Sequence, residues 1–149
     1  MRAREVMVKA PVTLPTSATI HEAAAAMDRA AVGAVVVLDG ERPVGLVTDR
    51  DLVTRALARR MPLDARVDAV MSTGVVCVDA DAELSEVASI LAVHPFRRIP
   101  VVEQDRMVGM VTLDDLIVRL ANDLHSVTRG VTAQLLFGHG EPQLPVTVR

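Results

Sequence analysis

VGLVTDRDLV, residues 44–53, and VGMVTLDDLI, residues 108–117, are two versions of one motif. Both contain the pattern G-x-V-T-x-x-D-L, in which β-branched residues lead to a Thr and an Asp follows three residues later. The β-branched run favours a strand, and the apolar pair after the Asp begins a helical pattern. The motif therefore predicts a strand, a turn and a helix start, with a hydroxyl and a carboxylate at the turn. We interpret the two turns as candidate ligand contacts.

The two motifs belong to a longer internal repeat, and a repeat decides the architecture of a chain. An offset of 64 residues relates their shared residues: Gly45 and Gly109, Thr48 and Thr112, and Asp51 and Asp115. The register continues without a gap to the start of the chain. We therefore define unit one as residues 1–64 and unit two as residues 65–128, followed by a helix extension and tail at 129–149.

Hydrophobic periodicity predicts the order β-α-β-β-α within each unit. A short extended stretch, at 12–14 or 75–78, precedes an amphipathic helix. The apolar positions of that helix follow i, i+3, i+4, i+7 spacing: Ile20, Ala23, Ala24 and Met27 in unit one, and Leu84, Val87, Ala88 and Leu91 in unit two. Thr19 and Glu22 stand at capping-box spacing before the first helix. Two apolar runs separated by a turn then predict a β-hairpin in each unit: 34–38 with 44–47, and 99–102 with 107–111. The predicted fold class is α+β.

A long C-terminal helix is predicted over residues 114–137, weakened at Gly130. Its apolar residues continue at helical spacing beyond the repeat: Leu116, Leu120, Leu124, Val127, Val131 and Leu135. This stripe is longer than one unit needs to cover its own sheet, so we expect it to face a second copy in a homodimer. Residues 138–149, with two Gly and two Pro, are predicted to be a loose tail.

Composition narrows the class of protein. No apolar run approaches the length of a membrane span, and the N-terminus has no signal-peptide pattern, so a soluble, cytoplasmic protein is predicted. A net charge of −3 argues against a nucleic-acid partner. Without Trp or Tyr, and with Phe96 and Phe137 as the two Phe residues, a nucleobase would have to sit between aliphatic walls.

Catalytic and metal-binding arrangements are weak. The four His residues are scattered, with no pair at i, i+4, and Cys77 has no cysteine partner. Cys77 lies in a β-like run and is interpreted as a small core residue. We predict no metal site, no catalytic residue and no required cofactor.

With a β-α-β-β-α unit, a gapless 64-residue period and G-x-V-T-x-x-D-L in both copies, the sequence resembles a tandem cystathionine-β-synthase (CBS) domain pair over about residues 1–128. The resemblance implies two units packed as a pseudo-twofold pair. It also implies two clefts that can bind adenosine-containing ligands such as AMP, ATP or S-adenosylmethionine.

The same resemblance assigns roles to individual residues. It implies that Asp51 and Asp115 hold ribose hydroxyls and that Thr48 and Thr112 lie near phosphates. It assigns part of the adenine pocket to Ile99-Pro100-Val101. The corresponding strand of unit one is Val35-Val36-Val37 and lacks the Pro, a departure from the family pattern.

Elementary chemistry is consistent with these roles. A carboxylate can accept hydrogen bonds from two adjacent ribose hydroxyls, and a helix N-terminus favours a phosphate. T-x-x-D is equally a capping pattern, which stabilises a helix without any ligand. Both interpretations of the motif remain open at this point.

Positive charge near the clefts is predicted to be unequal. Arg97 and Arg98 precede the pocket strand of unit two, where unit one has Gly33 and Ala34. We therefore expect the Asp115 cleft, with Arg98 on one side and small Gly33 and Ala34 opposite, to be the stronger site. Arg50 could partly serve the Asp51 cleft. The alternative for Arg97 and Arg98 is an exposed pair at a solvated edge.

Three functions are compatible with the sequence. The leading hypothesis is a non-catalytic regulatory module that binds an adenine nucleotide and acts as a homodimer, on an effector protein that the sequence does not identify. The second is a structural dimerisation module whose clefts bind nothing. The third is an enzyme such as a nucleotide hydrolase, which the residues support least.

Overall fold

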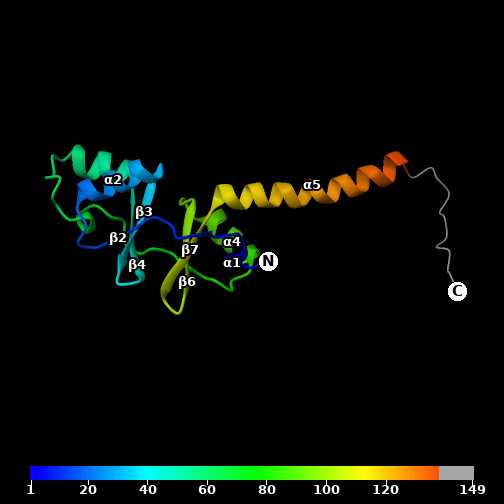
Figure 1. The fold of residues 1–149 in the computed structure, drawn as a ribbon, viewed down its shortest axis with the longest axis horizontal. Helices are drawn as coiled ribbons and strands as arrows, with labels where there is room; N and C mark the ends of the chain where they lie inside the picture. Colours follow the sequence, from blue (N-terminus) through cyan, green and yellow to red (C-terminus); the bar gives the residue numbers. More distant parts are fainter. Residues whose placement is uncertain (138–149) are drawn as a thin grey trace.

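The computed structural model describes the backbone of residues 1–137 and the side chains of residues 1–131. The predicted tail at 138–149 and the side chain of Leu135 lie outside these described residues. The chain forms two sheets, each with its own helices, and one long helix that extends beyond them (Figure 1). The predicted α+β class and the two β-α-β-β-α repeats are confirmed. No helix in the described part of the chain is long and apolar enough to cross a membrane.

Unit one is built on a three-stranded sheet of order β2-β3-β4. Strand β2 runs parallel to β3, and β3 and β4 form the predicted hairpin. The elements are β2 (Thr13–Pro15), α2 (Ile20–Ala30), β3 (Ala34–Asp39), β4 (Arg42–Thr48), α3 (Asp49–Asp51) and the π-helix η1 (Leu52–Leu57). The hydroxyl of Thr54 donates to the carbonyl of Arg50 four residues earlier, a contact that competes with the α-helical ladder where the helix widens.

Helix α2 begins at the predicted capping box. The Thr19 hydroxyl accepts from the Glu22 N–H at 3.1 Å, and the Thr19 N–H donates to the Glu22 carboxylate at 2.8 Å. The buried face differs slightly from the predicted one, because Ala24 is exposed and Ala26 is buried. The small alanines allow the helix to turn this face toward the sheet without a large change in packing.

Unit two repeats the plan in a four-stranded sheet of order β1-β7-β6-β5. Its elements are β5 (Val78–Asp79), α4 (Leu84–Val93), β6 (Arg98–Glu103), β7 (Arg106–Thr112) and α5 (Leu113–Phe137). The hairpins of the two units share their register: Ala34 lies opposite Thr48, and Arg98 opposite Thr112. Each pair differs from the other by the 64-residue offset of the sequence.

The first residues of each unit pack on the sheet of the other unit. Strand β1 (Val8–Lys9) pairs with β7 through Val8 and Met110, and Ser72 forms a bridge to Leu46 of β4. Figure 1 shows the N-terminal segment crossing from unit two, where α1 lies, to β2 of unit one. The division at residue 64 therefore describes the sequence repeat, while the sheet of unit two takes in strand β1 from unit one and the sheet of unit one receives a bridge from Ser72 of unit two.

The two hydrophobic cores are exchanged in the same way. Ala3, in helix α1 (Ala3–Val6), belongs to the core of unit two, and Val67, in the 3₁₀ helix η2 (Val67–Ala69), belongs to the core of unit one. The Ala3 N–H donates to the Ala82 carbonyl at 2.9 Å, and the Val67 N–H donates to the Ala18 carbonyl at 2.7 Å. Sequence periodicity did not predict α1, β1 or η2, because each spans only two to four residues, too few for a periodic pattern to be detected.

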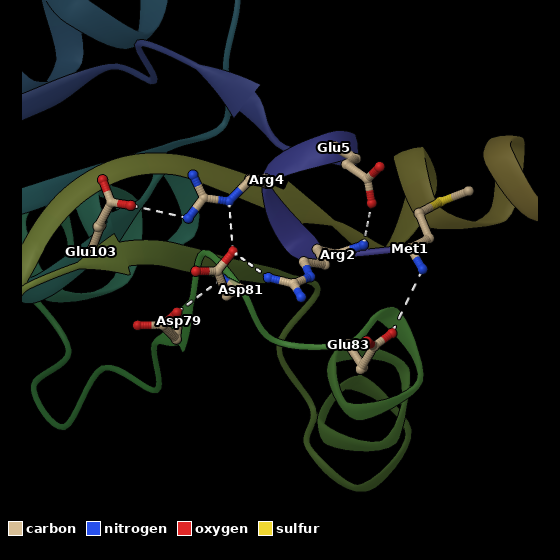
Figure 2. Close-up of polar contacts among 8 residues, drawn as sticks. All are labelled: Met1, Arg2, Arg4, Glu5, Asp79, Asp81, Glu83 and Glu103. Carbon is tan, nitrogen blue, oxygen red and sulfur yellow. Dashed lines mark hydrogen bonds and ion pairs between the residues drawn. The ribbon is translucent and has the colours of Figure 1, made fainter.

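Polar contacts hold the N-terminus against unit two (Figure 2). The Arg2 and Arg4 guanidinium groups each donate to Asp81 Oδ1 at 2.9 Å, and Arg4 also donates to Glu103 at 3.0 Å. Hydrogen bonds from Arg2 and then Arg4 hold the pKa of Asp81 below its usual range. Two arginine side chains from the start of the chain thus share the Asp81 carboxylate of unit two.

The hairpin ends of the two units also meet. Arg106 forms an ion pair with Glu41 at 2.6 Å, and the Met107 N–H donates to the Glu41 carbonyl at 2.9 Å. The side-chain hydrogen bond to Glu41 raises the pKa of Arg106. Strands β4 and β7 lie in contact, so the units also pack against each other through their hairpins.

Helix α5 begins one residue before the predicted position and continues through Gly130. Leu116 is buried under unit two, but the following apolar residues are half or more exposed: Ile117, Leu120, Leu124, Val127 and Val131. In Figure 1 this helix extends well beyond the sheets. The predicted long helix is confirmed, and its apolar stripe is uncovered in the single chain.

Candidate functional site

The repeated T-x-x-D turns are helix caps in both units. The Thr48 hydroxyl accepts from the Asp51 N–H at 3.1 Å, and the Asp51 carboxylate accepts from the Thr48 N–H at 2.9 Å. In unit two the Thr112 hydroxyl accepts from the Asp115 N–H at 3.1 Å and donates to Asp115 Oδ2 at 2.6 Å. The motif therefore caps a helix in both units, and this role leaves open whether the same residues also contact a ligand.

Capping leaves the Asp51 carboxylate with capacity for a ligand. A carboxylate offers about four lone-pair sites. The cap uses one on Oδ2, and Oδ1 lies 3.6 Å from Arg55 Nε in a loose ion pair. The Asp51 side chain is 15% exposed, which keeps it accessible from one side. Cap and ligand acceptor are compatible roles for this residue.

Asp51 lies in the wall of a cavity of about 320 Å³, which we name the Asp51 cavity. This volume is within the range of about 300–1,000 Å³ that is typical of small-molecule sites. Both units contribute to the wall. Its residues are Leu46, Thr48, Asp51, Ser72, Thr73, Gly74, Val75, Val76, Pro95, Phe96 and Arg98.

A second cavity, of about 400 Å³, is lined by Thr112 and is named the Thr112 cavity. Its residues are Val8, Ala10, Pro11, Val12, Ala30, Ala31, Val32, Gly33, Ala34, Arg98, Met110 and Thr112. Most of these positions match the wall of the Asp51 cavity at the 64-residue offset. Thr112 corresponds to Thr48, Val32 to Phe96, and Ala34 to Arg98. The two cavities are pseudo-equivalent, with different chemistry at equivalent positions.

Asp115 does not line the Thr112 cavity. It lies instead in a separate hollow with Glu5, Val6, Val118, Arg119 and Asn122, between α1 and α5. Its carboxylate is held by the short hydrogen bond from Thr112. Asp51 is therefore the carboxylate that shares a cavity wall with Arg98. From the sequence we expected Asp115 in that place, in the stronger of the two clefts.

The structure separates the three predicted arginines. Arg98, exposed at the start of β6, lines both cavities. Arg97 lines neither and approaches Asp114 at 3.7 Å on the surface. Arg50 lies in a shallow hollow with Asp49 on the outer side of its turn, away from the Asp51 cavity. Arg98 is thus the predicted cation that the fold brings to the cavities.

The remaining predicted residues divide between wall and core. Gly33 and Ala34 line the Thr112 cavity beside Arg98, as the sequence predicted for the position opposite that arginine. Ile99 and Pro100 are fully buried in strand β6 and line neither cavity. They support the sheet from which Arg98 projects.

Phe96 corrects one prediction from composition. This half-buried aromatic ring forms part of the Asp51 cavity and stacks on His94, with the ring centroids 4.7 Å apart. A base in this cavity would therefore meet an aromatic wall, where the sequence predicted only aliphatic ones. Its neighbour Pro95 and the segment 72–76 were also missed. The 64-residue offset of the repeat could have identified the segment, because it aligns residues 72–76 with residues 8–12 of the Thr112 cavity.

Backbone conformation is shared between the cavities as well. Gly74 has φ +70° in the Asp51 cavity, and Ala10, its equivalent in the Thr112 cavity, has φ +51°. Both are left-handed conformations, which a glycine adopts without the cost that a Cβ imposes. The same bend admits each crossing segment to its cavity.

Residues for other chemistry do not gather in the described part of the chain. Among the residues that the structure describes, no three His, Cys, Asp or Glu side chains could together hold a metal ion. The Cys77 thiol is half-buried, and desolvation raises its pKa, which favours the unreactive protonated form at neutral pH.

Similarity to known proteins agrees with this architecture. The chain is 44% identical over 99 residues to the protein YlbB of Bacillus subtilis, spanning 65% of this chain and 67% of that protein. A CBS domain protein of Pyrobaculum aerophilum, PAE2072, solved in complex with AMP, has a TM-score of 0.69 and 27% identity over 82% of this chain and 99% of its own. The CBS domain pair of MJ0100, solved with 5-methylthioadenosine and S-adenosylmethionine, has a TM-score of 0.70 and 26% identity over 83% and 97%.

The CBS domain family itself matches the chain twice, over residues 3–58 and 67–122. These two matches contain the two T-x-x-D turns and nearly all of both sheets. The chain belongs to the CBS domain family and contains a tandem pair of CBS domains.

Proposed function

We propose that this protein is a non-catalytic regulatory module that binds an adenosine-containing ligand between its two CBS domains. The observation that carries the proposal is the Asp51 cavity, which has a carboxylate, a hydroxyl, a guanidinium and an aromatic ring in one wall. Asp51 would accept from the ribose hydroxyls, and Phe96 would pack on the base. Arg98 would bind the phosphate, which a guanidinium can hold by two parallel hydrogen bonds.

Related structures support the ligand class. AMP is bound in PAE2072, and 5-methylthioadenosine and S-adenosylmethionine are bound in MJ0100. These ligands share adenosine and differ in what the 5′ carbon carries. The shared part would be bound by residues common to the fold, and the variable part by residues such as Arg98. Ligand would regulate only if it binds one packing of the two units better than another.

A direct binding measurement tests the proposal. The chain has no Trp or Tyr, so a retained adenine would dominate the near-ultraviolet spectrum at 260 nm. Isothermal titration with AMP, ATP and S-adenosylmethionine would then give affinities. Asp51→Asn keeps an acceptor oxygen for the cap and should weaken binding about 10-fold, a loss of about 1.4 kcal/mol.

Asp49→Asn is the matched control, since Asp49 lies in the same turn and outside the Asp51 cavity. Its affinity should equal that of the wild type. If none of the three ligands binds at millimolar concentration and no adenine band is retained, the proposed function is wrong.

A second function, dimerisation, is favoured by a separate observation. We propose that α5 pairs with α5 of a second copy. Its exposed apolar residues recur at 3.5-residue spacing over two heptads: Ile117, Leu120, Leu124, Val127 and Val131. A stripe of this kind is complementary to itself in a twofold dimer. Dimerisation and ligand binding use different surfaces and can coexist.

A further inference from the structure

Among the residues that the structure describes, Arg98 is the one Lys or Arg that lines the Asp51 cavity and also the one that lines the Thr112 cavity. It is exposed at the first position of β6, opposite Thr112 on β7. Within the described residues its guanidinium forms no hydrogen bond or ion pair with another side chain. The charge is therefore available to a ligand from either side.

The repeat explains why there is one such charge and not two. The equivalent of Arg98 in unit one is Ala34, which lies at the matching position in the Thr112 cavity. An alanine cannot reach beyond its own cavity, whereas the long arginine contributes to both walls. Two pseudo-equivalent cavities thus share one cation.

We propose that Arg98 couples the two cavities negatively, so that a phosphorylated ligand bound in one weakens the binding of a second in the other. The inference rests on the proposed function and deepens it. A guanidinium that holds a phosphate through two hydrogen bonds has its planar fork committed to that phosphate. A second phosphate would enter a wall without a counter-charge, near an existing anion. The coupling is reciprocal by thermodynamic linkage.

The preferred first site is the Asp51 cavity, because Asp51 and Phe96 line it together with Arg98. The Thr112 cavity offers Val32 and Ala34 at the equivalent positions and no carboxylate. A ligand without phosphate, such as adenosine, does not compete for the arginine. Negative coupling is therefore a property of phosphorylated ligands alone, and it would let the protein distinguish them from uncharged nucleosides.

Titration calorimetry of the full chain with AMP and with adenosine tests the coupling. Thr73→Trp places a large side chain in the wall of the Asp51 cavity, distant in sequence from Arg98, and blocks that cavity. The Thr112 cavity of this variant should bind AMP about 10-fold more tightly than the second site of the wild type, a typical size for such coupling. Adenosine should show no such gain. When Arg98 is replaced by Met, blocking the Asp51 cavity with Thr73→Trp should leave the AMP affinity of the Thr112 cavity unchanged.

Ala34→Arg provides an independent variant if Thr73→Trp does not fold. It places an arginine at the equivalent position of the Thr112 cavity, so the second AMP should bind more tightly than it does in the wild type, while the affinity for adenosine should not change. An unchanged second-site affinity for AMP, either after blocking or in Ala34→Arg, would overturn the coupling while leaving ligand binding intact. Failure of both AMP and adenosine to bind the wild type would overturn the proposed function, and the coupling with it.

Discussion

The glycine of each repeated motif is required by a methionine from the other unit. A Cβ at Gly45 would collide with the Met71 side chain, whose Cγ would be 2.8 Å away. A Cβ at Gly109 would lie 2.8 Å from Met7 Cγ and 2.9 Å from the Val8 carbonyl oxygen. Met7 and Met71 are themselves 64 residues apart. The motif is therefore partly a packing signature of the exchanged segments, independent of any ligand.

Gly45 and Gly109 have different neighbours, so replacing each by Ala should have unequal effects on stability. Gly109→Ala should lower the free energy of unfolding by about 1–3 kcal/mol, the usual cost of overpacking, because backbone of β1 cannot move aside as a side chain can. Gly45→Ala should cost less, since the three atoms nearest to the added Cβ all belong to the flexible Met71 side chain. Urea denaturation followed by circular dichroism measures both.

Methionine truncation provides the control for this pair. Met71→Ala should largely relieve Gly45→Ala, whereas Met7→Ala should relieve Gly109→Ala only in part, because the Val8 carbonyl remains. Equal losses at the two glycines, or full relief in both double variants, would contradict the packing explanation.

At the scale of elements, helix α1 is held to unit two by charge. Asp81 accepts from both Arg2 and Arg4, and its pKa is lowered in the folded state. A lowered folded pKa stabilises the fold above the ordinary pKa of 3.8, and the contribution is lost as the pH falls through the lower folded value. The contact should therefore act at neutral pH and fail in acid.

Asp81→Asn tests this pH dependence. The variant should be less stable than the wild type from pH 5 to 8, and the difference should shrink as the pH is lowered below about 3.8. The midpoint of thermal unfolding across this pH series is the measurement. Asp64→Asn, at an exposed position without an ion pair in the described chain, is the control. A stability difference that is independent of pH would show that the effect is not electrostatic.

At the scale of the whole molecule, α5 carries apolar residues that the single chain leaves exposed. Its exposed stripe lies outside the two cores, so burial of these residues requires another surface. An unpartnered helix that projects into water is marginal in stability, because most helical stability in proteins comes from packing of the apolar face. A second α5 would supply that packing.

Leu124→Asp should therefore convert a dimer to a monomer, as measured by light scattering during size-exclusion chromatography. Leu124 lies at the centre of the stripe, and a buried carboxylate in the pairing surface is strongly unfavourable. Ser126→Asp adds the same charge to another face of the helix and should remain dimeric. A monomeric wild type, or a Leu124→Asp variant that stays dimeric with an unchanged circular dichroism spectrum, would rule out pairing through α5.

The predictions from sequence succeeded where structure is local. The hairpins at β3-β4 and β6-β7, the capped helix α2 and the long helix α5 follow from periodicity and capping chemistry, which act over a few residues. The internal repeat further predicted that the two units have the same order of elements. The roles predicted for Thr48, Asp51 and Arg98 as ligand contacts remain predictions, and the fold brings these three residues to one cavity.

By itself, then, the amino-acid sequence determined the two repeated units, their elements and the shared T-x-x-D turns, because each depends on neighbours along the chain. Only the tertiary structure decided which carboxylate lines a cavity, that Phe96 joins it, that the N-terminus completes the sheet of unit two, and that Arg98 serves both cavities. These features depend on contacts between residues far apart in the sequence, such as Val8 and Met110, which pair in the sheet of unit two and both line the Thr112 cavity. No local pattern records such contacts, since they arise when the two units pack and exchange their first residues.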